Sequence, residues 1–135
     1  MQKIALITGT SRGIGKALAE LLLRENFNVF GYSRTNQIEN KNFTFIKTDL
    51  SKLEEVQKIK FPKINSSDSI ILVNNAATIG KIIPLDKKSE GEIVDEYNLN
   101  IIAPTIFSKK FIQSYKIAQK LIINIGSGAA KKAIS

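Results

Sequence analysis

Short runs of apolar residues alternate along this chain with longer segments in which apolar residues recur every three or four positions. Such runs are typical of strands buried on both faces of a parallel sheet, and the spaced pattern is typical of amphipathic helices. The pattern predicts five strands, at Ile4–Ile7, Val29–Ser33, Phe43–Ile46, Ile70–Val73 and Leu121–Ile125.

Three helices are expected between these strands, over about 14–24, from 49–51 to just before Pro62, and from Ser89 or Glu90 onward. Asn26 is expected to stop the first helix, and Pro62 ends the second because proline cannot continue a helix interior. The apolar spacing in the first helix comes from Ile14, Ala17, Leu18, Leu21 and Leu22. In the third, one face carries Ile93, Val94, Tyr97, Ile101 and Thr105.

Strands that alternate with amphipathic helices form βαβ units, whose crossovers are right-handed. The predicted fold class is therefore α/β, with helices on both faces of a doubly wound parallel sheet. The chain has 135 residues and shows no internal repeat or linker-like stretch, so we expect one domain over residues 1–135.

Composition narrows the chemistry that this domain can perform. The chain has neither cysteine nor histidine, which excludes disulfide bonds, zinc fingers, Ser-His-Asp triads and a histidine general base. No metal site is expected. The sequence has no signal-peptide pattern and no apolar stretch long enough to cross a membrane. We therefore expect a cytoplasmic protein without a membrane partner.

The net charge of +8 comes mostly from lysine, since seventeen of the twenty basic residues are lysine. Scattered lysines keep a surface solvated, which is the simplest interpretation of this charge. Nucleic-acid binding is a weaker alternative, because no basic block exceeds two residues and aromatic residues do not alternate with the basic ones. No nucleic-acid partner is expected.

A glycine-rich stretch follows the first predicted strand and opens the first predicted helix. Gly9, Gly13 and Gly15 could supply the tight turn, the close approach to a pyrophosphate and the close helix packing of a dinucleotide-binding loop. The phosphate loop of nucleoside triphosphatases is excluded, because its glycine spacing differs and Ala17 stands where a magnesium-binding hydroxyl is required. A glycine turn without a ligand remains the alternative.

The end of the second predicted strand lacks the acidic residue that binds the ribose 2′-hydroxyl of NAD. Arg34 stands there instead, and Arg12 lies in the glycine loop. Arginine pairs with a phosphate through charge-assisted hydrogen bonds, whereas a carboxylate would repel it. We therefore expect NADP(H) in preference to NAD(H). The alternative is that Arg34 is a solvated loop residue.

Four motifs together resemble the short-chain dehydrogenase/reductase family over the whole chain. They are the glycine loop Thr8–Gly15, Asp49-Leu50 after the third strand, Asn74–Ala77 after the fourth, and Asn100 with Ser127 further on. Ala77 departs from the family's Asn-Asn-Ala-Gly pattern and adds a methyl group near the cofactor. Within the family, Asn-Asn-Ala-Ala and Gly-Ser-Gly-Ala-Ala look most like the sepiapterin reductase and benzil reductase branch.

The resemblance implies a Rossmann-type sheet of strand order 3-2-1-4-5, truncated after the fifth strand. It also implies hydride transfer between NADP(H) and a small carbonyl or alcohol substrate, with Asn100 and Ser127 as catalytic residues. The residues expected to bind the cofactor are Gly9, Ser11, Arg12, Gly13, Ile14, Gly15, Ser33, Arg34, Asp49, Leu50, Asn75, Ala76 and Ala77.

The family's general acid/base is a tyrosine with a lysine four residues later, and none of Tyr32, Tyr97 and Tyr115 has such a lysine. The chain is therefore expected to be the N-terminal portion of a single-domain reductase and to be inactive alone. For the intact protein, the resemblance implies a homo-oligomer, dimer or tetramer, that pairs through the helix around Asn100. The alternative is a non-catalytic NADP(H)-binding or regulatory module, against which the presence of Asn100 and Ser127 argues.

Two local features, Pro104 and the fifth strand, lead to further predictions. Pro104 interrupts the long helical pattern and has no N–H, so we expect a kink at which the carbonyl of Asn100 is free to bind a buried water. The fifth strand, Leu121–Ile125, is expected to form an apolar edge of the sheet, which invites aggregation or self-pairing.

Overall fold

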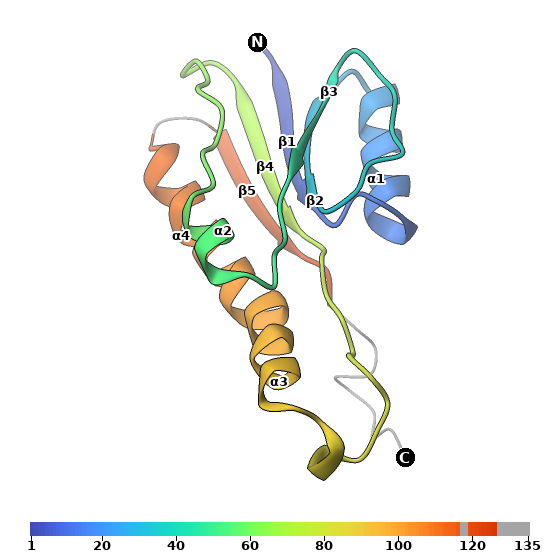
Figure 1. The fold of residues 1–135 in the computed structure, drawn as a ribbon. Coiled ribbons are helices and arrows are strands. Elements are labelled where there is room, and N and C mark those ends of the chain that lie inside the picture. The colour runs from blue at the N-terminus through green and yellow to red at the C-terminus, as the bar shows by residue number, and fades with distance from the viewer. Residues whose placement is uncertain (117–118, 127–135) are drawn as a thin grey trace.

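A parallel sheet organises the fold, and all five predicted strands are part of it (Figure 1). The computed structural model describes residues 1–116 and 119–126. The strand order is β3-β2-β1-β4-β5 and every neighbouring pair is parallel, so the predicted fold class and order are confirmed. The strands are β1 Lys3–Thr8, β2 Asn28–Ser33, β3 Phe43–Lys47, β4 Ser69–Asn74 and β5 Gln119–Asn124. The α-helices are α1 Gly13–Arg24, α2 Leu53–Gln57, α3 Glu90–Tyr97 and α4 Ala103–Ser114.

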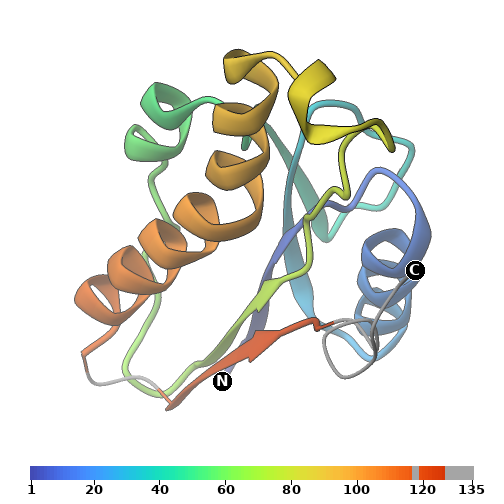
Figure 2. The same cartoon turned by 90° about the horizontal axis from the view of Figure 1, so that it is seen from below.

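Helices lie on both faces of the sheet. α1 packs on one face over β1 and β2, and α2 and α4 pack on the other (Figure 2). The core on the α1 side includes Ala5, Ile7 and Val29, and the larger core on the α4 side includes Leu6 and Leu72. Successive strand residues point to opposite faces, so a strand covered on both sides is apolar at consecutive positions. Within the described ranges, no helix has the length and apolarity of a membrane span.

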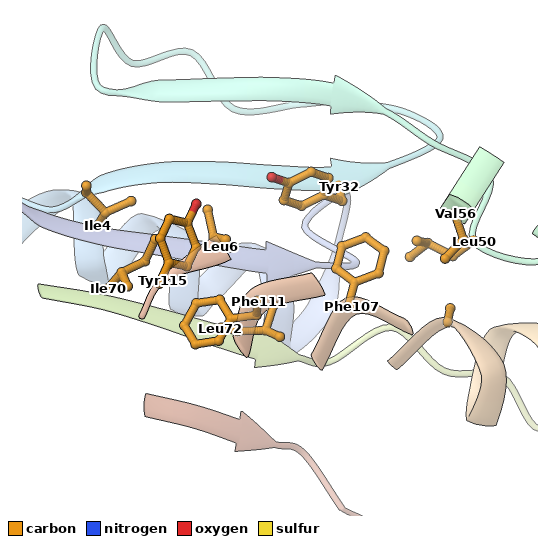
Figure 3. Close-up of a cluster of buried hydrophobic side chains, with 11 residues drawn as sticks. Ile4, Leu6, Tyr32, Leu50, Val56, Ile70, Leu72, Phe107, Phe111 and Tyr115 are labelled. Carbon is orange, nitrogen blue, oxygen red and sulfur yellow. The ribbon is translucent and has the colours of Figure 1, made fainter. Parts of the chain in front are cut away.

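The larger core is built around aromatic side chains (Figure 3). Phe107 of α4 is fully buried and meets Tyr32 of β2 edge to face, with ring centroids 5.3 Å apart. One helical turn later, Phe111 meets Tyr115 with centroids 5.2 Å apart. Such pairs contribute about 0.5–1.5 kcal/mol each beyond the area they bury. The Tyr32–Phe107 pair fixes α4 on the sheet, and with it the helical segment that precedes α4.

The buried face of α1 differs from the one that its large apolar residues predict. Ile14 and Leu21 are exposed, and the buried positions are Gly15, Ala19 and Leu23. Two of these buried residues are small, which lets the helix backbone approach the sheet closely. The spacing therefore identified the helix, but residue size decided which side faces the core.

The helix ends also differ in how well they were predicted. α1 ends at Arg24, as predicted, and Asn26 follows in the left-handed conformation with φ of 65°. α2 is shorter than predicted and ends at Gln57 rather than just before Pro62. The carbonyls of Gln57 and Ile59 accept hydrogen bonds from the side chain of Lys110, which takes the place of further helical bonds.

The predicted long helix is divided by a π-helical turn at Asn98–Ile102, called the π turn below. This irregularity lies where Pro104 predicted a kink, and π turns of this kind are frequent at functional sites. The residues predicted to share a face do not form the buried face, since Val94, Tyr97 and Ile101 are all more than half exposed. The reason is that α3 extends beyond the ends of the strands (Figure 1). The water on the Asn100 carbonyl and the homo-oligomer contact stay predictions.

β5 is an edge of the sheet in the described part of the chain, as predicted. Leu121 and Ile123 pair with Ile71 and Val73 of β4, so they lie on the α1 side of the sheet. They are 55% and 37% exposed, because α1 packs over β1 and β2 rather than over β5. The predicted tendency to aggregate through this edge is untested.

Tyr32 and Tyr115 form a matched pair for testing the aromatic core. The Tyr115 hydroxyl donates to the Pro62 carbonyl at 2.6 Å, whereas the buried Tyr32 hydroxyl has no hydrogen-bond partner among the described residues. We expect Tyr115→Phe to lower the free energy of unfolding by about 1 kcal/mol, and Tyr32→Phe to leave it unchanged or raise it. Urea unfolding followed by circular dichroism measures both. Equal losses in the two variants would contradict this account.

Candidate functional site

A cavity of about 970 Å³ opens at the carboxyl ends of the strands. Its walls are the loops that follow β1, β2, β3 and β4, together with part of α3 and the π turn. Parallel strands end at one edge of a sheet, so loops far apart in sequence meet there. The predicted residues that line this cavity are Gly9, Ser11, Arg12, Gly13, Ser33, Arg34, Asp49, Leu50, Asn75, Ala76 and Ala77.

Three of the predicted site residues that the structure describes do not line the cavity. Ile14 is exposed on α1, and Gly15 is buried beneath the glycine loop. Asn100 lies on the π turn, where its side chain bonds to the backbone of Thr78. Ser127 lies outside the described residues.

The glycine loop leaves backbone N–H groups open to a ligand. Gly9 and Gly13 adopt φ of 74° and 60°, a region that favours glycine. A Cβ on Gly13 would meet no atom within 4 Å, so this side of the loop faces open space. Arg12, the N-cap residue of α1, makes no side-chain capping hydrogen bond. The first N–H groups of α1 and its positive dipole end are therefore available to an anion.

Hydrogen bonds join the end of β1 and the loop that follows it to the loop after β4. The Thr8 hydroxyl accepts from the backbone N–H groups of Asn75 and Ala76, both at 3.0 Å. The side-chain amide of Asn75 donates to the carbonyls of Thr8 and Gly9, both at 3.2 Å. Asn75 therefore holds the two loops together from within the cavity wall, and Ala76 and Ala77 continue that wall.

The positive end of the cavity lies at β2. Arg34 follows directly after β2 and lines the cavity together with Arg12, and no carboxylate is present in the segment Ser33–Thr35. Asp49 lines the neighbouring wall. Burial raises the pKa of Asp49, but hydrogen bonds from Ser51 and the charges of Arg34 and Lys52 outweigh it and hold that pKa below its usual range. Asp49 is therefore an ionised acceptor at neutral pH.

Acid/base and metal chemistry have few candidates in the part of the chain that the structure describes. Burial raises the pKa of Tyr32, with a further contribution from Tyr115, and burial also raises the pKa of Tyr115. Both hydroxyls belong to the aromatic core, so neither is placed to exchange protons in the cavity. No group of three or more metal-ligating side chains occurs among the described residues.

The sequence prediction missed the helical wall of the cavity and the outer part of the loop after β4. Asp95 and Leu99 line it from α3 and the π turn, and Thr78 and Lys81 line it from the loop after β4. Residues directly after strands could have been found from the strand ends alone. Asp95 and Leu99 do not follow a strand, so no local pattern identifies them. Their position depends on how α4 packs against the sheet.

A family model described as short chain dehydrogenase matches residues 3–135. The chain belongs to the short-chain dehydrogenase family. It is 33% identical to the benzil reductase of Bacillus cereus and 34% identical to that of Bacillus subtilis, with 96% of this chain aligned to each. It spans 58% and 56% of those two relatives, a little over half of their length. A solved short-chain dehydrogenase/reductase from Burkholderia vietnamiensis has a TM-score of 0.84 at 24% identity, covering 99% of this chain and 67% of that one.

The cavity of this short-chain dehydrogenase fits a dinucleotide in its chemistry. Among solved structures of similar fold, a serine dehydrogenase has been solved with NADP⁺ and a short chain dehydrogenase from Leptospira borgpetersenii with NAD⁺. An open glycine loop at an uncapped helix N-terminus suits a pyrophosphate, and an ionised acceptor on the neighbouring wall suits an amino group. The two arginines suit a further phosphate.

Gly15 tests how closely α1 must approach the strand ends, and Gly91 in α3 is the matched control. A Cβ on Gly15 would overlap the Gly9 carbonyl oxygen and lie 2.8 Å from its carbonyl carbon, whereas one on Gly91 would lie 3.9 Å from the Ser89 hydroxyl. We expect Gly15→Ala to lower the free energy of unfolding by about 1–3 kcal/mol, and Gly91→Ala to leave it unchanged or raise it slightly. Thermal and urea unfolding measure both. A Gly15→Ala variant as stable as Gly91→Ala would contradict the close contact.

Proposed function

We propose that this chain forms the cofactor-binding part of an NADP(H)-dependent carbonyl reductase. The observation that carries the proposal is that Arg12 and Arg34 line the same cavity, next to a β2 end without a carboxylate. Each charge-assisted hydrogen bond to a 2′-phosphate is worth about 1.5–3 kcal/mol. The ribose 2′-hydroxyl of NAD would offer these arginines no such charge.

The remaining walls suit the other parts of the cofactor. The N–H groups at Gly13 and the start of α1 would hold the pyrophosphate, as helix N-termini do for anions. Asp49 and Leu50 would contact the adenine, and Asn75 with Ala76 would line the path toward the nicotinamide. When bound, the nicotinamide supplies or accepts the hydride.

Two residues are proposed to act on the substrate side. The Ser127 hydroxyl would orient the substrate oxygen by hydrogen bonding, and the backbone carbonyl of Asn100 would hold a water that relays protons. The π turn supports the second role, because Pro104 has no N–H to offer the preceding turn. A vicinal diketone is the substrate class to try first, given the similarity to benzil reductases.

Reduction of a carbonyl also needs a proton on the product oxygen. None of the three tyrosines in this chain has a lysine four residues later, and two of them lie in the aromatic core. We therefore propose that the 135-residue chain binds the cofactor but lacks the group that donates this proton.

Arg34 and Arg24 form a matched pair for testing cofactor choice. Arg34 lines the cavity, whereas Arg24 lies in the last turn of α1, away from it. We expect Arg34→Ala to weaken NADP⁺ binding by about 10- to 150-fold and to leave NAD⁺ binding within about twofold. Arg24→Ala should change neither. Isothermal titration calorimetry measures all four affinities, and an equal loss for NADP⁺ and NAD⁺ in Arg34→Ala would contradict the assignment.

Turnover tests the missing proton donor. We expect the chain to bind NADPH and yet to leave it unoxidised in the presence of benzil, because none of its three tyrosines has the lysine four residues later that the proposed proton donor requires. Absorbance of NADPH over time measures this, with a benzil reductase as the positive control for the assay. Steady, enzyme-dependent consumption of NADPH would refute the proposal that the chain binds the cofactor but lacks the proton donor.

A further inference from the structure

The π turn carries two asparagines whose side chains bond to two different loops of the cavity. Asn100 binds both backbone groups of Thr78: its Oδ1 accepts from the N–H at 2.8 Å and its Nδ2 donates to the carbonyl at 2.7 Å. Asn98 donates from its Nδ2 to the carbonyl of Ser51 at 3.0 Å. One helical segment therefore holds the loop after β4 with one amide and the loop after β3 with the other.

The contact at Ser51 reaches a charged group in the cavity wall. The Asp49 carboxylate accepts hydrogen bonds from the Ser51 N–H at 3.0 Å and from the Ser51 hydroxyl at 2.6 Å. The backbone N–H of Asp49 donates to the Glu55 carboxylate at 3.0 Å, which ties the same loop to α2. A shift of Ser51 would therefore move the Asp49 carboxylate, while the Asp49 backbone stayed anchored to Glu55 of α2.

A second interaction joins the same loop to the same helical segment. The Lys52 ammonium lies 3.4 Å from both carboxylate oxygens of Asp95, one turn before Asn98. Both side chains are 45% exposed, so this ion pair contributes little by itself. The Asn98 amide makes the shorter and more buried contact, at 3.0 Å from the Ser51 carbonyl.

We propose that Asn98 is a positioning residue for the adenosine end of the cofactor. Its amide holds Ser51 in place, and through Ser51 it keeps Asp49 and Leu50 in the cavity wall. This inference rests on the proposed cofactor function. It adds a specific consequence: a residue on a helix that follows β4 sets the affinity for a ligand group bound beyond β3.

Variants at Asn98 separate this role from general stability. Asn98→Ala removes the amide, and Asn98→Leu removes it while keeping a side chain of similar size. Tyr97→Ala is the matched control, because Tyr97 is 59% exposed on the same segment and does not line the cavity. The probe is 2′,5′-ADP, which carries the adenosine and the 2′-phosphate without the nicotinamide.

We expect both Asn98 variants to bind 2′,5′-ADP about three- to tenfold more weakly than the unaltered chain in calorimetry, and Tyr97→Ala to bind it equally well. Without ligand, hydrogen exchange at the N–H groups of Ser51 and Lys52 should accelerate by a similar factor. Exchange at Thr78, which Asn100 holds, should stay the same. Melting temperatures show whether each variant is folded.

The outcomes distinguish failure of the proposed role of Asn98 from failure of the proposed cofactor function. Unchanged exchange at Ser51 would overturn the inference whether or not the cofactor binds. Faster exchange with unchanged 2′,5′-ADP affinity would also overturn it, since Asn98 would then shape the loop without affecting the ligand. Failure of the unaltered chain to bind either 2′,5′-ADP or NADP⁺ would contradict the proposed function itself, and this inference with it.

Discussion

At Gly15 the backbone of α1 comes so close to the end of β1 that a Cβ there would overlap the carbonyl oxygen of Gly9. The same hypothetical Cβ would also meet the side-chain amide of Asn75, which bonds to the carbonyls of Thr8 and Gly9. Three segments therefore share one small volume: the end of β1, the start of α1 and the loop after β4. The helix N-terminus is fixed between β1 and β4, where the crossovers leave in opposite directions and a ligand site opens.

The opposite side of the cavity depends on the aromatic core rather than on glycine. Phe107 and Phe111 anchor α4 against the sheet, so the π turn that precedes α4 is held above the strand ends. From there, Asn98 and Asn100 reach the loops after β3 and β4. Core packing on one face of the sheet thus determines the shape of a polar site at its edge.

Charge has two separate uses in this molecule. Lysine side chains donate to backbone carbonyls where α-helices end: Lys3 to Glu25 after α1, Lys110 to Gln57 at the end of α2, and Lys120 to Tyr115 after α4. A cation is favourable there, because the last carbonyls of a helix lack partners and its dipole is negative at that end. Part of the lysine excess is therefore structural, which adds to its interpretation as surface solvation. Two of the three arginines instead line the cavity.

Apolar runs and residues after strand ends are local patterns, so the five strands, their parallel arrangement and most of the cavity residues at the strand ends could be predicted from the sequence. Gly9, Arg34 and Asn75 could be found in this way. Tertiary structure alone decided that Gly15 and Ala19 face the sheet while Ile14 points to solvent, since backbone approach depends on the size of residues that meet in space. It also decided that Asn98 reaches Ser51, a contact across 47 positions that no spacing along the chain encodes.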